Sequence, residues 1–112
     1  MCYYDNVIGI REYLDVSGRS PFADWLSDLN APAAAKVNTA LRRISLGNFS
    51  DVKSVGTGVL EYRLDFGPGY RIYFGKDGEQ LVILLGGGTK KRQQNDIAIA
   101  IHLWKDYKQR KE

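Results

Sequence analysis

The fold is decided by one stretch of alternating residues, 58–74. It reads Gly58-Val59-Leu60-Glu61-Tyr62-Arg63-Leu64-Asp65-Phe66-Gly67-Pro68-Gly69-Tyr70-Arg71-Ile72-Tyr73-Phe74. Up to residue 66 apolar and charged side chains alternate, which is typical of a strand with one packed and one wet face. Residues 66–69 supply turn chemistry, after which the alternation resumes. The stretch therefore predicts a β-hairpin.

Downstream, Lys76-Asp77-Gly78 has the signature of a second hairpin turn, and it leads into Leu81–Leu85. This run is apolar throughout, so we expect a central strand that is covered on both faces. Gly86-Gly87-Gly88 ends the strand. A last helix follows, whose broad apolar face includes Ile97, Ala100, Ile101, Leu103, Trp104 and Tyr107.

Upstream, residues 7–14 alternate and predict a first strand. Ser20 and Pro21 form an N-cap and N1 pair for a short helix, which Asn30 and Pro32 are expected to end. A second helix is predicted over 33–46 with Gly47 at its C′ position, followed by a polar loop over 48–58.

The predicted order is β-α-α-β-β-β-α over a single domain, residues 1–112. It predicts an α+β fold in which an antiparallel sheet is packed by a helical hairpin and a C-terminal helix, in two layers. Alternation places Arg63, Arg71 and Tyr73 on one face of the hairpin, which we expect to face solvent.

Composition narrows the function classes. The chain of 112 residues has one cysteine, Cys2, and one histidine, His102, so we expect neither a disulfide nor a metal site, and no cofactor. Its N-terminus lacks the pattern of a secretory signal, and its apolar runs are shorter than the roughly 18 residues of a membrane helix. These features favour the cytoplasm and no membrane association.

Charge is distributed unevenly along the chain. Residues 1–35 carry two basic and five acidic side chains, whereas residues 36–112 carry 14 basic and 8 acidic ones. Clustered cations favour a polyanionic partner such as nucleic acid, and the alternative is an ordinary solvated surface.

Three segments together resemble the HigB-like "addiction module killer" branch of the RelE/ParE toxins. They are Gly58–Phe74, then Val82–Lys91 followed by Asp96-Ile97, and Arg19–Phe22. The resemblance covers nearly the whole chain. It implies a type II toxin that is neutralised by an antitoxin encoded next to it, expected to be a helix-turn-helix protein.

In the RelE and HigB branches the resemblance also implies a metal-independent endoribonuclease that cuts mRNA on the ribosome. Basic residues on the sheet orient the 2′-hydroxyl, stabilise the transition state and protonate the leaving oxygen. In-line attack adds negative charge at phosphorus, so fixed cations lower the barrier.

Several of the candidate site residues have an alternative interpretation. Arg63 matches a basic strand residue of the family, or it pairs with Glu61 or Asp65 on a wet face. Arg71 follows the turn at the position of the family's phosphate-contacting arginine. Lys90 lies near a basic catalytic position, or it begins a solvated helix.

The other candidates are less central. Glu61 has the position of a general base, or it is locked by Arg63. Lys53 is a loop lysine that could reach phosphate. Further nucleic-acid contacts are assigned to Lys91, Arg92 and Tyr73.

The sequence departs from the family at one point. A tyrosine or histidine is common near the C-terminal helix in the family's ribonucleases, and here the region offers Asn95, Asp96 and, deeper in the helix, His102. Two other functions therefore remain open, a ParE-like inhibitor of DNA gyrase and a non-catalytic relative that binds only its antitoxin. Because we expect Arg71 at the surface, Arg71→Ala should abolish growth inhibition and leave the fold and antitoxin binding intact.

Overall fold

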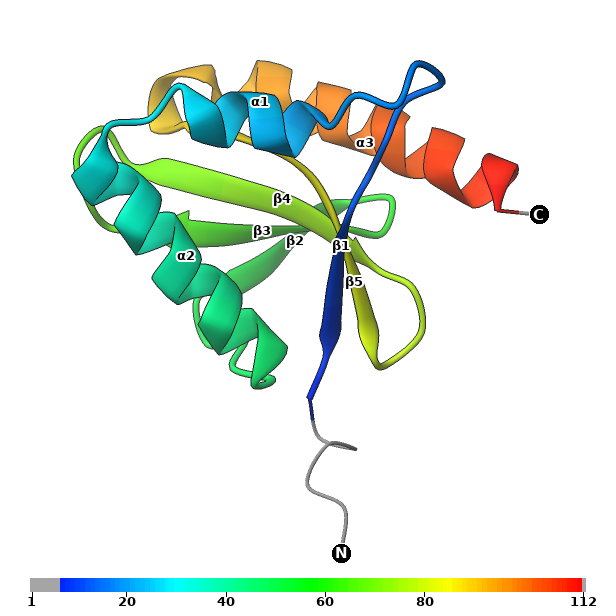
Figure 1. Cartoon of the computed structure of the whole chain (residues 1–112), viewed down its shortest axis with the longest axis horizontal. Helices are drawn as coiled ribbons and strands as arrows, with labels where there is room; N and C mark the ends of the chain where they lie inside the picture. The colour runs from blue at the N-terminus through cyan, green and yellow to red at the C-terminus, as the bar shows by residue number, and fades with distance from the viewer. Residues whose placement is uncertain (1–6, 112) are drawn as a thin grey trace, which may run out of the picture.

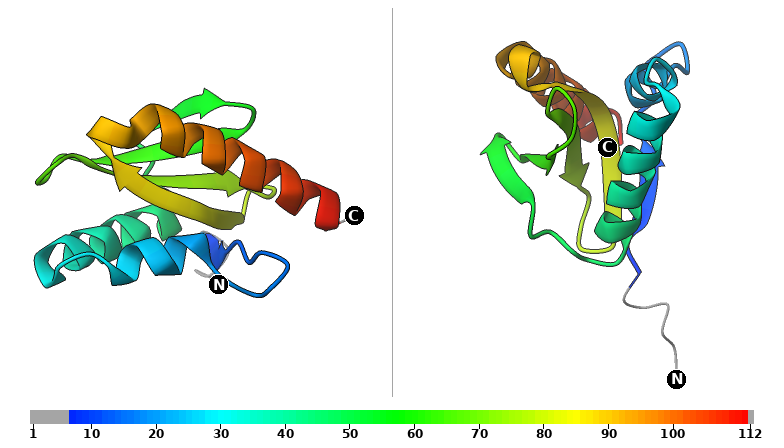
Figure 2. Two further views of the ribbon diagram at one scale, coloured as in Figure 1. Left: turned by 90° about the horizontal axis from the view of Figure 1, so that it is seen from above. Right: turned by 90° about the vertical axis from the view of Figure 1, so that its left-hand side faces the viewer.

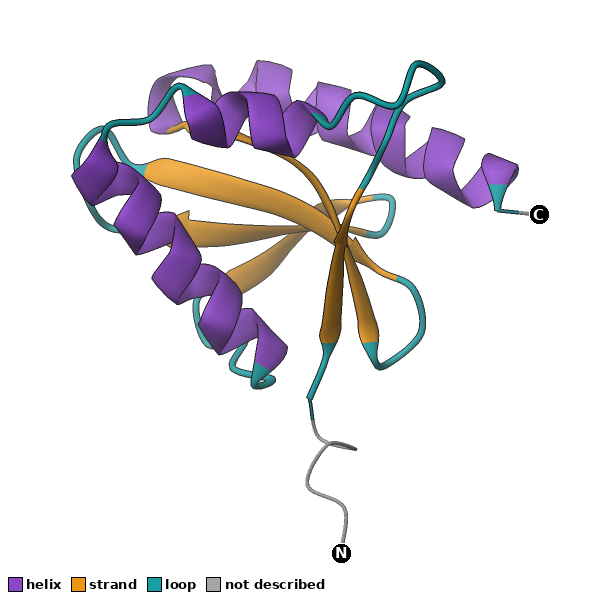
Figure 3. Cartoon of the chain, in the orientation of Figure 1, coloured by secondary structure: helices purple, strands orange, loops and turns teal. Residues whose placement is uncertain are grey.

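A computed structural model describes residues 7–111 as a five-stranded sheet with helices on both faces, as Figures 1 and 3 show. Cys2 and the rest of residues 1–6, on which the expected absence of a signal was based, lie outside the described residues. The elements are β1 (Gly9–Glu12), α1 (Pro21–Ser27), α2 (Ala31–Ser45), β2 (Val52–Gly56), β3 (Val59–Leu64), β4 (Tyr70–Lys76), β5 (Leu81–Thr89), the 3₁₀ turn η2 (Lys90–Arg92) and α3 (Gln93–Arg110). The α+β class is confirmed.

The sheet has the strand order β1-β5-β4-β3-β2. The strands β2 to β5 form an antiparallel meander, and the expected apolar strand β5 lies inside the sheet. β1, however, pairs with β5 in parallel, so the sheet is mixed and not purely antiparallel. Side-chain alternation identifies a strand but does not set its direction, because backbone hydrogen bonds make the pairing.

The expectation of a loop over residues 48–58 was wrong, because Val52–Gly56 is an additional strand, β2. This strand lies at the edge of the sheet, and its side chains are exposed or half-buried, so it has no strong apolar alternation. It is held by its backbone pairing with β3. Lys53 is therefore a strand residue, and the pairing of β2 with β3 fixes which face of the sheet its side chain is on.

The helical hairpin begins and ends where local chemistry predicts, with one exception. The Ser20 side chain accepts a hydrogen bond from the Ala23 N–H at 2.9 Å, as expected of an N-cap. Asn30 and Pro32, expected to end the first helix, instead begin the second. Asn30 accepts a hydrogen bond from the Ala33 N–H at 2.9 Å, and Pro32 lies in the first turn of α2, which starts at Ala31 and not at residue 33. Gly47 has a φ of 82° and closes α2 with a left-handed C-terminal cap.

The helices cover opposite faces of the sheet, which Figure 2 shows from two directions. Residues of α1 and α2 pack against one face around Phe22, Ile44 and Phe74. Residues of α3 pack against the other face around Trp104. The expectation of two layers was therefore incorrect, because the face with the charged side chains is itself partly covered. Within residues 7–111 no helix is long and apolar enough to span a membrane.

Two carboxylates clamp the C-terminal end of α3 to the sheet. Asp77, in the turn before β5, accepts hydrogen bonds from the Tyr107 hydroxyl and the Lys111 ammonium, both at 2.6 Å. Asp106 on α3 accepts from the Tyr13 hydroxyl at 2.6 Å and from Arg110 at 2.8 Å. The helix is thus fixed at this end by polar contacts as well as by Trp104.

These clamps predict an acid-sensitive docking of α3. Hydrogen bonds from Lys111 and Tyr107 hold the pKa of Asp77 below its usual 3.8, and Tyr13 and Arg110 do the same for Asp106. A carboxylate with a depressed pKa stabilises the fold fully above its unfolded value and loses this contribution as pH falls through its folded value. We therefore expect Tm to fall as the pH drops below 3.8.

The measurement is Tm against pH for the wild type and for the double variant Asp77→Asn/Asp106→Asn. The variant should melt lower than the wild type near neutral pH, and this difference should shrink in acid. Glu79→Gln, in the same turn as Asp77, is the matched control and should follow the wild type. A difference that stays constant down to acid pH would contradict the clamp.

Candidate anion-binding site

Arg63 and Arg71 lie directly opposite each other on the neighbouring strands β3 and β4. Glu61 and Tyr73 form the next such pair on the same face. The prediction that Arg63, Arg71 and Tyr73 share one face is confirmed. The prediction that this face is open to solvent holds for Arg63 but is wrong for Arg71 and Tyr73, which are only 4% and 1% exposed.

The cause of this burial is α3 and the turn that precedes it. Tyr73 belongs to the core beneath the helix, together with Trp104. Arg71 lies at the boundary, between exposed Arg63 on one neighbouring strand and buried Gly88 on the other. Asp96 of α3 sits so close above Gly88 that a Cβ there has no room.

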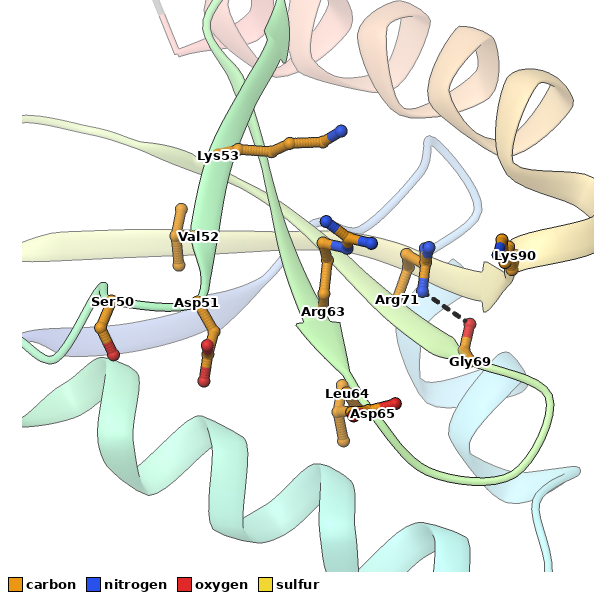
Figure 4. A pocket seen from close by; sticks show the side chains of 10 residues that line it. All are labelled: Ser50, Asp51, Val52, Lys53, Arg63, Leu64, Asp65, Gly69, Arg71 and Lys90. Carbon is orange, nitrogen blue, oxygen red and sulfur yellow. Dashed lines mark hydrogen bonds between the residues drawn. The ribbon is translucent and has the colours of Figure 1, made fainter.

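A pocket of about 520 Å³ opens on this boundary, and Figure 4 shows the side chains around it. Four cations from four different elements line it, namely Lys53 of β2, Arg63 of β3, Arg71 of β4 and Lys90 of η2. The acidic Asp51 and Asp65 also line it. The structure thus brings together four of the residues singled out from the sequence.

The arrangement of Arg63 and Arg71 favours an anion between or above them. Like charges directly opposite each other on neighbouring strands destabilise a sheet, and a bound anion relieves this repulsion. Among the described residues, Arg63 forms no ion pair with Glu61 or Asp65, the alternative considered from the sequence. Its charge is therefore available to a ligand.

Glu61 does not belong to the open part of the site. Its side chain is fully buried, and it does not line the pocket. Its ionic partner is Arg71, with 4.0 Å between Arg71 Nε and Glu61 Oε2, and not Arg63 as the sequence suggested. The same oxygen accepts hydrogen bonds from the Tyr73 hydroxyl at 3.1 Å and from Gln93 Nε2 at 2.8 Å.

Tyr73 is enclosed and offers no surface to a nucleic acid, which corrects its assignment as a direct contact. Burial raises the pKa of its hydroxyl, and the neighbouring charge of Glu61 adds to this effect. Tyr73 therefore stays neutral and serves as a hydrogen-bond donor to Glu61.

The basic run at residues 90–92 forms the 3₁₀ turn η2, and its side chains do not all face the pocket. Lys90 lines the pocket, whereas Lys91 and Arg92 are exposed on the same turn but outside the pocket lining. Asp96 follows on α3, half-buried, and burial raises the pKa of its carboxyl, against the opposing influence of Arg92. His102 is exposed on the helix.

A second pocket of about 310 Å³ continues from the first towards α2. The two pockets share Asp51, Arg63, Leu64 and Asp65. The second adds Lys36 and Arg43 from α2. No motif marks these two residues, because their place beside Arg63 results from the packing of α2 on the sheet.

Comparison with known proteins assigns the chain to a family. Residues 24–105, which include every lining residue of both pockets, match the profile of the Gp49-like phage-derived proteins (DUF891). The chain belongs to this Gp49-like family. It is a RelE/ParE-like toxin family, so the resemblance seen in the sequence is confirmed at the level of the superfamily.

The Gp49-like chain also has a relative in Haemophilus influenzae. The two sequences are 49% identical over 77 residues, which is 68% of this chain and 78% of the relative. That protein carries no functional name.

Proposed function

We propose that this Gp49-like protein is the toxin of a type II toxin-antitoxin system, in the HigB-like branch, and that it cleaves mRNA on the ribosome without a metal. The observation that carries the proposal is the pocket in which Lys53, Arg63, Arg71 and Lys90 converge. Attack of a 2′-oxygen on the adjacent phosphorus adds negative charge to the phosphoryl oxygens. Fixed cations stabilise that charge most where water is partly excluded.

Each cation of the pocket has a role in this chemistry. Arg71, held in place by burial, donates its hydrogen-bonding fork to the phosphoryl oxygens. Arg63 binds the same group from the neighbouring strand. Lys90 gives a proton to the leaving 5′-oxygen, and the 2′-hydroxyl gives its proton to water in the open pocket. Lys53 contributes charge from the edge strand.

The adjoining pocket extends the proposal from one phosphate to a strand. Lys36 and Arg43 continue the line of positive charge from Arg63 to α2. A single-stranded RNA whose scissile phosphate lies at Arg63 and Arg71 can place a neighbouring phosphate beside Lys36 and Arg43. Lys91 and Arg92 extend the basic surface on the other side, next to Lys90.

The partners follow from the proposed target. The substrate is mRNA in the ribosome, which places the protein in the cytoplasm. Its neutralising partner is expected to be a helix-turn-helix antitoxin encoded by a neighbouring gene.

The test is cleavage of a defined mRNA on programmed ribosomes by the purified protein, alongside a DNA gyrase supercoiling assay with the same preparation. We expect cuts in the mRNA and normal supercoiling. Inhibited supercoiling with intact mRNA would replace the proposal by a gyrase inhibitor. No effect in either assay would favour a non-catalytic relative.

A further inference from the structure

The buried carboxylate of Glu61 sits behind the pocket and joins three parts of the protein. Its own strand is β3, Arg71 and Tyr73 come from β4, and Gln93 is the first residue of α3. The Gln93 amide donates to it at 2.8 Å, which is shorter than its contacts with Tyr73 and Arg71. This hydrogen bond ties the start of α3 to the charge behind Arg71.

Arg71 is restrained from two sides. On the inner side lies Glu61, with 4.0 Å between Nε and Oε2. On the outer side Arg71 Nη1 donates to the Gly69 carbonyl at 3.0 Å, in the turn that borders the pocket. The guanidinium is therefore held between a carboxylate and a backbone oxygen, both acceptors.

The inner contact is incomplete. Arg71 Nε and Glu61 Oε1 are both buried, and neither has a hydrogen-bond partner within residues 7–111. A buried polar group without a partner destabilises the fold, because its hydrogen bonds to water are lost and not replaced. On this side Arg71 is held by charge across 4.0 Å and not by a hydrogen bond, so the position of Glu61 affects where the guanidinium rests.

We propose that Glu61 is a positioning residue for Arg71, and that Gln93 sets its position and so couples the seating of α3 to the geometry of the anion pocket. The expected change in the cleavage rate rests on the proposed function. The expected change in the position of Arg71 rests on the buried hydrogen-bond network alone. This positioning role replaces the general-base role considered from the sequence. A base must come within hydrogen-bond reach of the proton it removes, and Glu61 does not line the pocket.

The first experiment compares Gln93→Ala and Gln93→Glu with the wild type. Gln93 is only half-buried, so its removal should leave the fold intact, and exposed Gln94→Ala on the same helical turn is the matched control. Gln93→Glu keeps the shape but loses the donor and adds a like charge beside Glu61.

Two readouts separate positioning from a structural role. The first is the Nε–Hε resonance of Arg71 in a ¹H–¹⁵N spectrum, assigned by its loss in Arg71→Lys, with and without an RNA whose scissile 2′-hydroxyl is replaced by hydrogen. The second is the split between kcat and KM in mRNA cleavage. We expect a shifted Arg71 resonance and a kcat lowered by about tenfold to a hundredfold, with KM changed less than about twofold.

Gln93→Glu should show the larger effect, and Gln94→Ala should match the wild type. Wild-type resonance and kcat in Gln93→Ala would overturn the proposal. If the wild type does not cleave mRNA, the proposed function fails, but the Arg71 resonance with the uncleavable RNA still decides whether Gln93 positions Arg71.

Glu61→Gln distinguishes positioning from base catalysis. The amide removes the charge but can still accept from Tyr73 and Gln93, so a positioning role predicts reduced cleavage with an unchanged pH dependence. If Glu61 is instead a general base, Glu61→Gln should abolish cleavage, and the increase of the cleavage rate with pH should disappear. If Glu61→Gln fails to fold, the Gln93 variants alone test whether Arg71 is positioned by this network.

Discussion

Arg71→Ala is expected to abolish growth inhibition and also to destabilise the fold, by about 3–5 kcal/mol. The reason for the second effect is the burial of the Glu61–Arg71 pair. Removing Arg71 leaves the charge of Glu61 buried without its ionic partner. The expectation from sequence, that the fold would tolerate this change as at a surface arginine, is replaced by this one.

Thermal melting and denaturant unfolding measure the effect. Arg71→Ala should lower Tm by more than about 10 °C in a chain of this size. The double variant Arg71→Met/Glu61→Gln removes both charges and should recover much of the stability while remaining inactive. Arg71→Lys should be partly active, because it keeps the charge and loses the fork.

This design separates loss of fold from loss of function. An inactive but stable double variant, beside a Glu61→Gln single variant that keeps part of its activity, assigns the activity to Arg71 itself. Wild-type melting of Arg71→Ala would contradict the buried pair, and full toxicity in the double variant would remove Arg71 from the site.

Arg63→Ala is expected to lose activity without losing stability, with a free energy of unfolding within about 0.5 kcal/mol of the wild type. Arg63 is exposed and forms no ion pair among the described residues, so its removal breaks no internal contact of that kind. If its charge stabilises the transition state, its loss should lower the cleavage rate about a hundredfold.

RNA binding provides an independent measurement for Arg63. Each phosphate contact that is lost should reduce the slope of log affinity against log salt by about 0.7 for a single strand. Arg42→Ala, an exposed arginine of α2 outside both pockets, is the control and should change neither cleavage nor the slope. Equal effects of the two variants would mean that general charge, and not the pocket, governs activity.

Local patterns account for much of this structure. The alternation over residues 60–74 and the turn at 66–69 correctly predicted the hairpin β3–β4. The pair Ser20-Pro21 predicted the start of α1, and Gly47 the end of α2. These features are encoded by neighbouring residues, because a cap, a tight turn or an alternating strand needs few residues close in sequence.

Features that depend on distant contacts were missed. β2 has little apolar character and exists through its pairing with β3, and the direction of β1 is set by its pairing with β5. The contribution of Lys36 and Arg43 to the second pocket depends in the same way on how α2 packs beside β3.

The candidate site shows most clearly the difference between what local sequence determines and what distant contacts determine. The sequence by itself determined that Arg63 and Arg71 share a face, because strand side chains alternate and residues 66–69 set the register of the hairpin. Only the tertiary structure decided that Arg71 is buried against Glu61 while Arg63 stays exposed. The physical reason is that burial depends on what covers a face, and here the cover is α3, whose Gln93 lies 32 residues beyond Glu61 in the chain.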